Sequence, residues 1–213
     1  MPQPLAANIS HSLAADLFTL VAHPRSAFPD LLQRRRPMEI MAFSAISGVY
    51  VAYLAAERLH LGDSVGFGPA LVFVLVCGPG LGLLALAFTD VVLTATASAA
   101  GTPADREVLA GVFGYATAPF LPLLVLLATI ETTAYGSALF SAHRPYVSPV
   151  IPAITTALEI LAIGAWLALM VEGTAAAVHV SEGRAARAVG LTFVRMLMIL
   201  VLLALISIVS FMI

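Results

Sequence analysis

Residues 157–196 read ALEILAIGAWLALMVEGTAAAVHVSEGRAARAVGLTFVRM, and this stretch decides the fold. It is typical of one membrane helix, a short basic loop and the start of a second membrane helix. Glu159 lies inside the first apolar run, Glu172 follows near its far end, and Arg195 lies inside the second run. The loop gathers four further titratable or charged residues, which are His179, Glu182, Arg184 and Arg187. Polar side chains in such a setting must either be paired or be used for function.

The composition extends this reading to the whole chain. Hydrophobic residues make up 61% of the 213 residues and charged residues only 10%, whereas a soluble domain carries about 25% charged residues. We therefore expect an all-α fold, a polytopic transmembrane helical bundle. The alternating segments of about ten residues that are typical of a membrane β-barrel are absent. No long basic arm is present, so nucleic acid is not an expected partner, and the single cysteine, Cys77, is interpreted as a packing residue.

The apolar runs predict five membrane spans, which would place the two termini on opposite sides of the membrane. Together they form one domain, residues 37–213, preceded by an arm of residues 1–36. The expected spans are residues 38–56, 65–100, 108–130, 153–178 and 188 to the C-terminus.

The second apolar run is too long for a simple crossing. A helix over residues 65–100 would be about 54 Å long, against a hydrocarbon core of about 30 Å. The motif CGPGLG at 77–82 favours one long helix kinked at Pro79. A helical hairpin turning at 78–80 is the alternative and would give six crossings. In the third span we expect kinks at Pro119 and Pro122, after an N-cap at Thr102.

The arm and the arginines predict the orientation. Leu13, Leu17, Leu20 and Val21 recur at helical spacing, which favours one or two short helices lying in the membrane interface. Arg34, Arg35 and Arg36 would anchor the arm among lipid headgroups, or alternatively bind a partner. With the N-terminus in the cytoplasm and the C-terminus outside, eight arginines lie on the cytoplasmic side and only Arg58 and Arg144 outside, a positive-inside pattern that fits an inner cell membrane.

Four acidic residues in or near the spans are candidates for a polar site: Asp90, Glu131, Glu159 and Glu172. A charge at mid-bilayer costs about 2.5–3.5 kcal/mol on insertion scales, so such residues pair, become protonated or face the bundle interior. Glu159 is expected deepest, and Glu131 is expected at the outer interface without a special role. Arg195 is expected to pair with Glu172, or alternatively to reach the headgroups.

The residues around His179 predict a polar cluster at the cytoplasmic face. Glu172 and His179 are two helical turns apart on roughly one face, and Glu182, Arg184 and Arg187 follow. A salt-bridged turn between two helices is the favoured interpretation. Metal binding is not favoured, because the spacing matches none of the familiar ligand motifs.

Three stretches resemble the Yip1-domain family of membrane proteins in its bacterial form. They are VAHPRSAFPDLL at 21–32, GVFGYATAPFLPLL at 111–124 and WLALMVEGTAAAVHVSEGRAARAVGL at 166–191. The resemblance implies a cytoplasmic N-terminal segment followed by five spans. Eukaryotic members are associated with small GTPases and vesicle traffic, but their long N-terminal region is missing here. The bacterial members bring no defined activity, so the resemblance bears on architecture more than on function.

We expect a non-enzymatic integral membrane protein that organises membrane or recruits partners through its cytoplasmic face. Its expected partners are membrane lipids, a second copy of the chain or a cytoplasmic protein, and no cofactor is expected. Neither a GxSxG elbow nor a P-loop occurs. The alternative is a small transporter or channel that uses Asp90, Glu159 and Glu172 with Arg195. An intramembrane enzyme with a metal at His179 is a third, less favoured interpretation.

Overall fold

The computed structural model describes residues 13–34, 36–99 and 105–212, and it contains helices but no strand in these ranges. Four segments are long and apolar enough to cross a membrane: Pro37–Arg58, Phe67–Ala97, Arg106–Ala138 and Val150–Val178. The expectation of an all-helical membrane protein is thereby confirmed. The expected fifth span lies within α9 (Glu182–Met212), and its crossing of the membrane stays a prediction.

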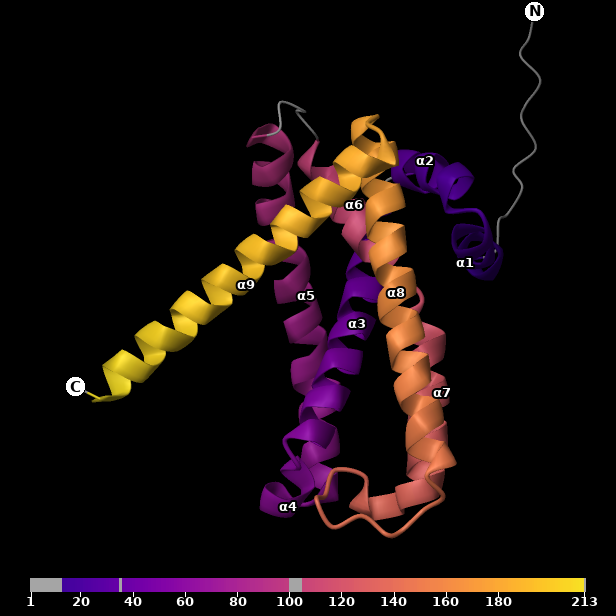
Figure 1. Cartoon of the computed structure of the whole chain (residues 1–213). Helices are drawn as coiled ribbons and strands as arrows, with labels where there is room; N and C mark the ends of the chain where they lie inside the picture. The colour runs from indigo at the N-terminus through magenta and orange to yellow at the C-terminus, as the bar shows by residue number, and fades with distance from the viewer. Residues whose placement is uncertain (1–12, 35, 100–104, 213) are drawn as a thin grey trace, which may run out of the picture.

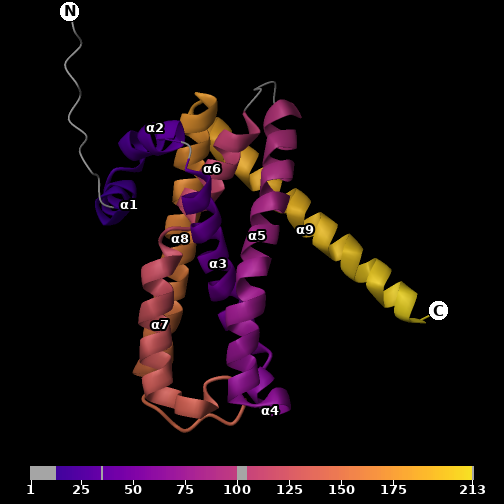
Figure 2. The same cartoon turned by 180° about the vertical axis from the view of Figure 1, so that it is seen from behind.

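The helices form an elongated bundle with two distinct ends (Figure 1). The arm end carries α1 (Leu13–Ala22), α2 (Pro24–Arg34) and the turn from α8 (Val150–Val178) into α9. The loop end carries α4 (Leu61–Val65) and the stretch 139–149, which follows η1 (Gly136–Ala138). Helix α9 begins beside α8 and leans away from the bundle toward the C-terminus (Figures 1 and 2).

The second apolar run forms one helix, α5 (Phe67–Ala99), with Pro79 inside it, so the hairpin alternative is wrong. The glycines of this run have a further role that the sequence reading missed. A Cβ placed on Gly82 would overlap the backbone of Ser44 in α3 (Pro37–Arg58), and one placed on Gly48 would overlap Gly78. Small residues four apart on both helices therefore let the two backbones touch.

The third expected span is divided into α6 (Arg106–Ala116) and α7 (Phe120–Tyr135). Residues 117–119 form a tight turn, in which the Phe120 N–H donates to the Thr117 carbonyl at 3.0 Å. Pro119 lacks an N–H to continue the α-helical pattern. The expected N-cap Thr102 lies outside the described residues; Asp105 caps α6 instead, accepting from the Glu107 N–H at 3.0 Å.

The arm is packed against the bundle, and its helices contribute to the largest cluster of buried residues. The chain breaks between α1 and α2 at His23, and Pro24 occupies the first position of α2, where its missing N–H costs nothing. Phe28 of α2 is fully buried, and its ring occupies the space in which a Cβ on Gly173 of α8 would stand, near Val112 of α6. The arm thus packs on α8 and α6 of the bundle.

Candidate functional site

The acidic residues of the spans are distributed over both ends of the bundle. Asp90 lies late in α5, is 6% exposed, and forms an ion pair with Arg106 at the start of α6. This pair ties together two helices that are consecutive in the chain. Only one carboxylate oxygen takes part, because Asp90 Oδ1 is buried without a hydrogen-bond partner among the described residues.

Glu172 pairs with the arm, so the expected Glu172–Arg195 pair is wrong. Arg25 of α2 places Nε 3.1 Å from Glu172 Oε2 and also contacts Glu182 through Nη2. Arg195 instead donates from Nη1 to Thr96 Oγ1 of α5 at 2.7 Å. The reason is the docking of α2 over α8, which covers the Glu172 side of α8, while Arg195 faces α5.

The polar cluster expected around His179 forms only in part. Glu182 joins it through Arg25, a residue that the sequence reading assigned to the arm alone. His179 ends α8 in the left-handed conformation with φ of 52°, a conformation in which histidine is among the more tolerated residues. Arg184 and Arg187 are exposed, and no ion pair joins either to a residue in the described ranges.

Two of the three arm arginines hold internal ion pairs. Arg34 lies 2.7 Å from Asp16 of α1, and Arg36 lies 2.7 Å from Glu39 at the start of α3. The hydrogen bond from Arg36 to Glu39, and then the charge of that carboxylate, raise the pKa of Arg36. Arg35 lies outside the described residues. The anchoring of these arginines in headgroups stays a prediction.

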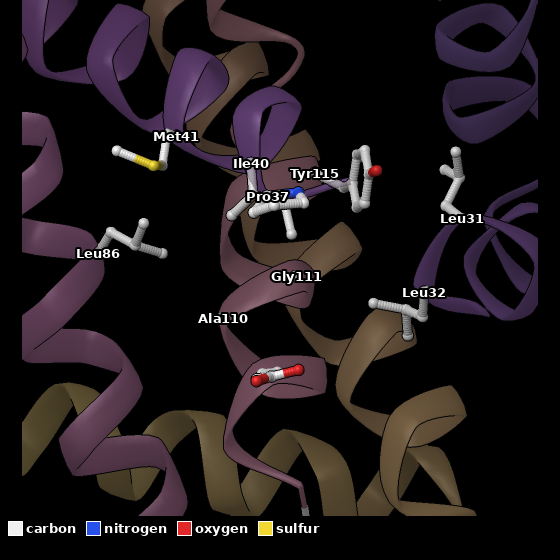
Figure 3. A pocket seen from close by; sticks show the side chains of 10 residues that line it. Leu31, Leu32, Pro37, Ile40, Met41, Leu86, Ala110, Gly111 and Tyr115 are labelled. Atoms are coloured by element: carbon white, nitrogen blue, oxygen red, sulfur yellow. The ribbon is translucent and has the colours of Figure 1, made fainter. Parts of the chain in front are cut away.

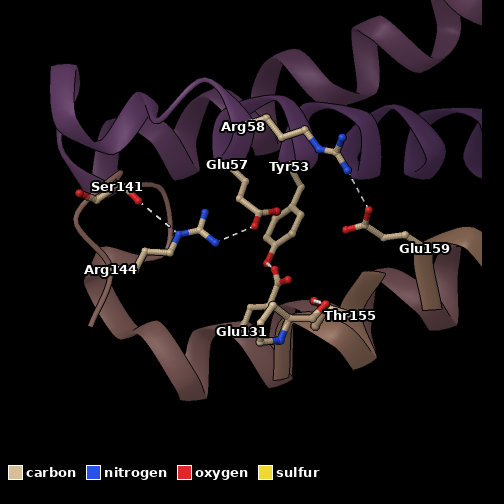
Figure 4. A network of polar contacts seen from close by, with 9 residues as sticks. Tyr53, Glu57, Arg58, Glu131, Ser141, Arg144, Thr155 and Glu159 are labelled. Carbon is tan, nitrogen blue, oxygen red and sulfur yellow. Dashed lines mark hydrogen bonds and ion pairs between the residues drawn. The ribbon is translucent and has the colours of Figure 1, made fainter. Parts of the chain in front are cut away.

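The loop end holds the densest polar network of the described residues (Figure 4). Glu57 of α3, Glu131 of α7 and Glu159 of α8 each bring one carboxylate oxygen within 4.8 Å of the others. Tyr53 donates a hydrogen bond to Glu131. Glu131 is only 2% exposed, so it is buried between the helices at the loop end, and its depth at the outer interface stays a prediction.

Two arginines balance this network. Arg58 lies 3.0 Å from Glu159, and Arg144 lies 2.8 Å from Glu57 (Figure 4). The carboxylate oxygens are close enough together to hold a hard cation, but two of the three carboxylates, Glu57 and Glu159, already pair with the two guanidinium groups. Sequence reading placed Glu57, Arg58 and Arg144 in surface loops. Tyr53 and Glu57 are one helical turn apart on one face of α3, and this spacing was the signal in the sequence that could have indicated the network.

Asp63 of α4 fastens the stretch 139–149 to the loop end. It accepts hydrogen bonds from the Ser141 hydroxyl and, at 2.9 Å, from the Ala142 N–H. Next to it, the Gly62 N–H donates to the Phe140 carbonyl at 2.7 Å. The Ser141 hydrogen bond first, and the Ala142 hydrogen bond second, lower the pKa of Asp63 below its ordinary value.

Acid is therefore expected to loosen residues 139–149. Because the pKa of Asp63 is lowered by folding, its carboxylate contributes stability above the ordinary value of about 3.9, and this contribution is lost as the pH falls through the lower folded pKa. Hydrogen exchange of residues 139–149 should be faster in Asp63→Asn than in wild type at about pH 5, with the difference shrinking at about pH 2.5. Asp30→Asn, at an exposed position of α2, is the control. An equal difference at both pH values would contradict this role.

A cavity of about 340 Å³ opens at the arm end between α2, α3, α5 and α6. Figure 3 shows Met41 and Leu86 on one side of it and Leu31 and Leu32 on the other. Its wall is mainly apolar, and among the described residues that line it only Glu107 and Tyr115 have polar side chains. The Tyr115 hydroxyl donates to Glu39 at 3.2 Å, so it is already engaged within the protein.

Comparison of the chain with protein-family models, curated proteins and solved structures gives no match.

Proposed function

We propose that this chain is a non-enzymatic integral membrane protein of the Yip1 type that organises membrane or recruits partners through its arm end, on the cytoplasmic side. The observation that carries the proposal is the docking of the N-terminal arm onto the last two helices. Phe28 is buried against α6 and α8, and Arg25 bridges Glu172 of α8 and Glu182 of α9. The arm end is therefore a surface built from distant parts of the chain.

The groups left exposed on this surface support contact with other molecules. Arg184 and Arg187 are exposed near the start of α9, where they are available to anionic headgroups or to an acidic protein surface. On the arm, Phe18 is 77% exposed and Val21 is 58% exposed. Apolar side chains beside cations are typical of segments that lie at a membrane interface.

The test is the double charge reversal Arg184→Glu with Arg187→Glu. Arg34 and Arg36 are less suitable because their reversal would also break internal ion pairs. We expect cross-linking in native membranes, followed by mass spectrometry, to recover fewer proteins and anionic lipids with the variant, while the helix content stays unchanged. Tyr146→Glu, at a 94% exposed position of the loop end, is the control. Equal recovery from both variants and wild type would overturn the proposal.

The loop-end network favours a second candidate function, the movement of a proton or cation. Three carboxylates within 4.8 Å of one another share two arginines, so the group carries one excess negative charge when all are ionised. Such intramembrane acids mark ion pathways in many membrane proteins.

Proteoliposome flux distinguishes the two functions. If the chain transports protons or cations through this network, Glu159→Gln should abolish the flux, whereas Asp90→Asn at the opposite end should not abolish it. Under the first proposal, folded wild-type protein should show no flux above empty vesicles. Flux that survives Glu159→Gln would exclude the loop-end network as the pathway.

A further inference from the structure

One side of α9 carries arginines first and apolar side chains further along, and the bundle does not cover it. Its members follow one another at intervals of three or four residues, so they line up along the helix. They are Arg184, Arg187, Leu191, Arg195, Met198 and Leu202, hereafter the α9 stripe. The three arginines are exposed, and the three apolar side chains are each more than half exposed. Because α9 leans away from the bundle (Figures 1 and 2), the stripe faces the surroundings of the protein.

The guanidinium group of Arg195 is held in place by α5. Its Nη1 donates to Thr96 Oγ1 at 2.7 Å. Thr96 is only 2% exposed, and its hydroxyl donates in turn to the Val92 carbonyl at 2.8 Å. A guanidinium has five N–H donors, and this is the one hydrogen bond that Arg195 forms within the described residues. The contact therefore fixes Arg195 and leaves most of its donors for another acceptor.

The positive charge of Arg195 is not balanced by an acidic side chain. No ion pair joins Arg195 to a residue in the described parts of the chain. Residues 183–213 contain no Asp or Glu, and neither do residues 91–104 at the end of α5. Residues 196–213, which follow Arg195 directly, are uncharged, so Arg195 stands where polar sequence meets apolar sequence. A cation at such a boundary attracts the anionic headgroups of the adjoining leaflet.

We propose that the α9 stripe binds an anionic phospholipid, with the phosphate on Arg195 and an acyl chain along Met198 and Leu202. The order of groups matches, because the two apolar side chains extend to about 10 Å beyond Arg195 along the helix, as an acyl chain extends from its phosphate. Guanidinium groups bind phosphate oxygens through several N–H groups at once. The ammonium group of a zwitterionic lipid would meet three arginines and no acidic side chain in the stripe. The inference rests on the proposed function, which places the start of α9 at the cytoplasmic leaflet.

The test compares dioleoyl phosphatidylglycerol with dioleoyl phosphatidylcholine, which share their acyl chains and differ in net charge. The full chain in detergent is titrated with each lipid, and native mass spectrometry gives an apparent Kd for each. We expect the anionic lipid to bind at least about 5-fold more tightly, the size of effect that one arginine near a charged membrane surface produces. Millimolar glycerol phosphate should not displace it, because this soluble anion has no acyl chain. Displacement would assign the site to soluble phosphate and would overturn the proposal.

Variants connect the lipid preference to the α9 stripe. Arg195→Gln should lower the preference for the anionic lipid about 5-fold. Thr96→Val keeps every charge but removes the acceptor that positions Arg195, so it should lower the preference about 2-fold. Tyr146→Glu, at a 94% exposed position of the loop end, changes the net charge by the same amount as Arg195→Gln and should have no effect. Circular dichroism checks that each variant is folded.

The proposal is overturned if wild type binds both lipids equally, if Arg195→Gln keeps the wild-type preference, or if Tyr146→Glu loses as much of it. Its failure is distinguishable from failure of the proposed function. If wild type binds both lipids equally but cross-linking to proteins in native membranes still depends on Arg184 and Arg187, the proposed function stands with an acidic protein surface as the partner.

Discussion

Gly82→Ala is expected to lower the free energy of unfolding by about 2–3 kcal/mol, as overpacking of a close contact typically does. The added methyl group would overlap the carbonyl oxygen of Ser44, which belongs to the backbone and cannot rotate away. Helices α3 and α5 would have to separate along their whole contact. Thermal or denaturant unfolding in detergent, followed by circular dichroism, measures the change.

Gly80→Ala provides the control for this result, since it makes the same substitution on the same helix. Apart from the neighbouring backbone of α5, no atom of the described residues lies within 4 Å of a Cβ at position 80, so the added methyl should leave stability unchanged or raise it by up to about 1 kcal/mol through helix propensity. If the free energy of unfolding rises for Gly80→Ala and falls for Gly82→Ala, the close contact between α3 and α5 is the cause. An equal loss of stability at both positions would refute this explanation and would point to glycine flexibility in α5.

Phe28→Ala is expected to release the arm from the bundle, at a cost of about 3–5 kcal/mol for a fully buried phenylalanine. The ring fills the space beside Gly173, next to Val112 of α6. Hydrogen exchange in α1 and α2 should become much faster, while exchange in α3 and α5 changes little. The effect is therefore local, and it separates docking of the arm from folding of the spans.

Phe18→Ala is the matched control, because this ring lies on the same arm but is 77% exposed. Its stability change should stay within about 0.5 kcal/mol, as for most exposed substitutions. If Phe28→Ala leaves the exchange of α1 and α2 unchanged, the arm is held by its ion pairs alone. Arg25→Ala would then be the variant that releases it.

The helices could be predicted from the sequence because length and apolarity suffice to define a membrane helix. The partners of the polar groups could not, because they depend on which helix faces meet. Glu172 was expected to bind Arg195, the nearest opposite charge on the adjoining helix, but the arm supplies Arg25 from 147 positions away. Such a distant contact has no local signal.

Residues 77–82 are a second example of a helix contact that the sequence alone did not predict. Glycines beside a proline predict a bend, and this was the expectation for α5. In the structure Gly78 and Gly82 meet Ser44 and Gly48 of α3. The spacing of four residues on both helices was visible in the sequence, but it indicates a contact only when the partner helix is known.

The position of the arm's binding surface has a consequence for biosynthesis. Arg25 and Phe28 are synthesised well before Glu172, Gly173 and Glu182, against which they pack. Chains are synthesised at about 5–20 residues per second, so the Phe28 ring stays uncovered for about 7–30 seconds until Glu172 and Gly173 have been made. During this interval the arm is open to a protease or a chaperone, and it docks only after α8 has been made.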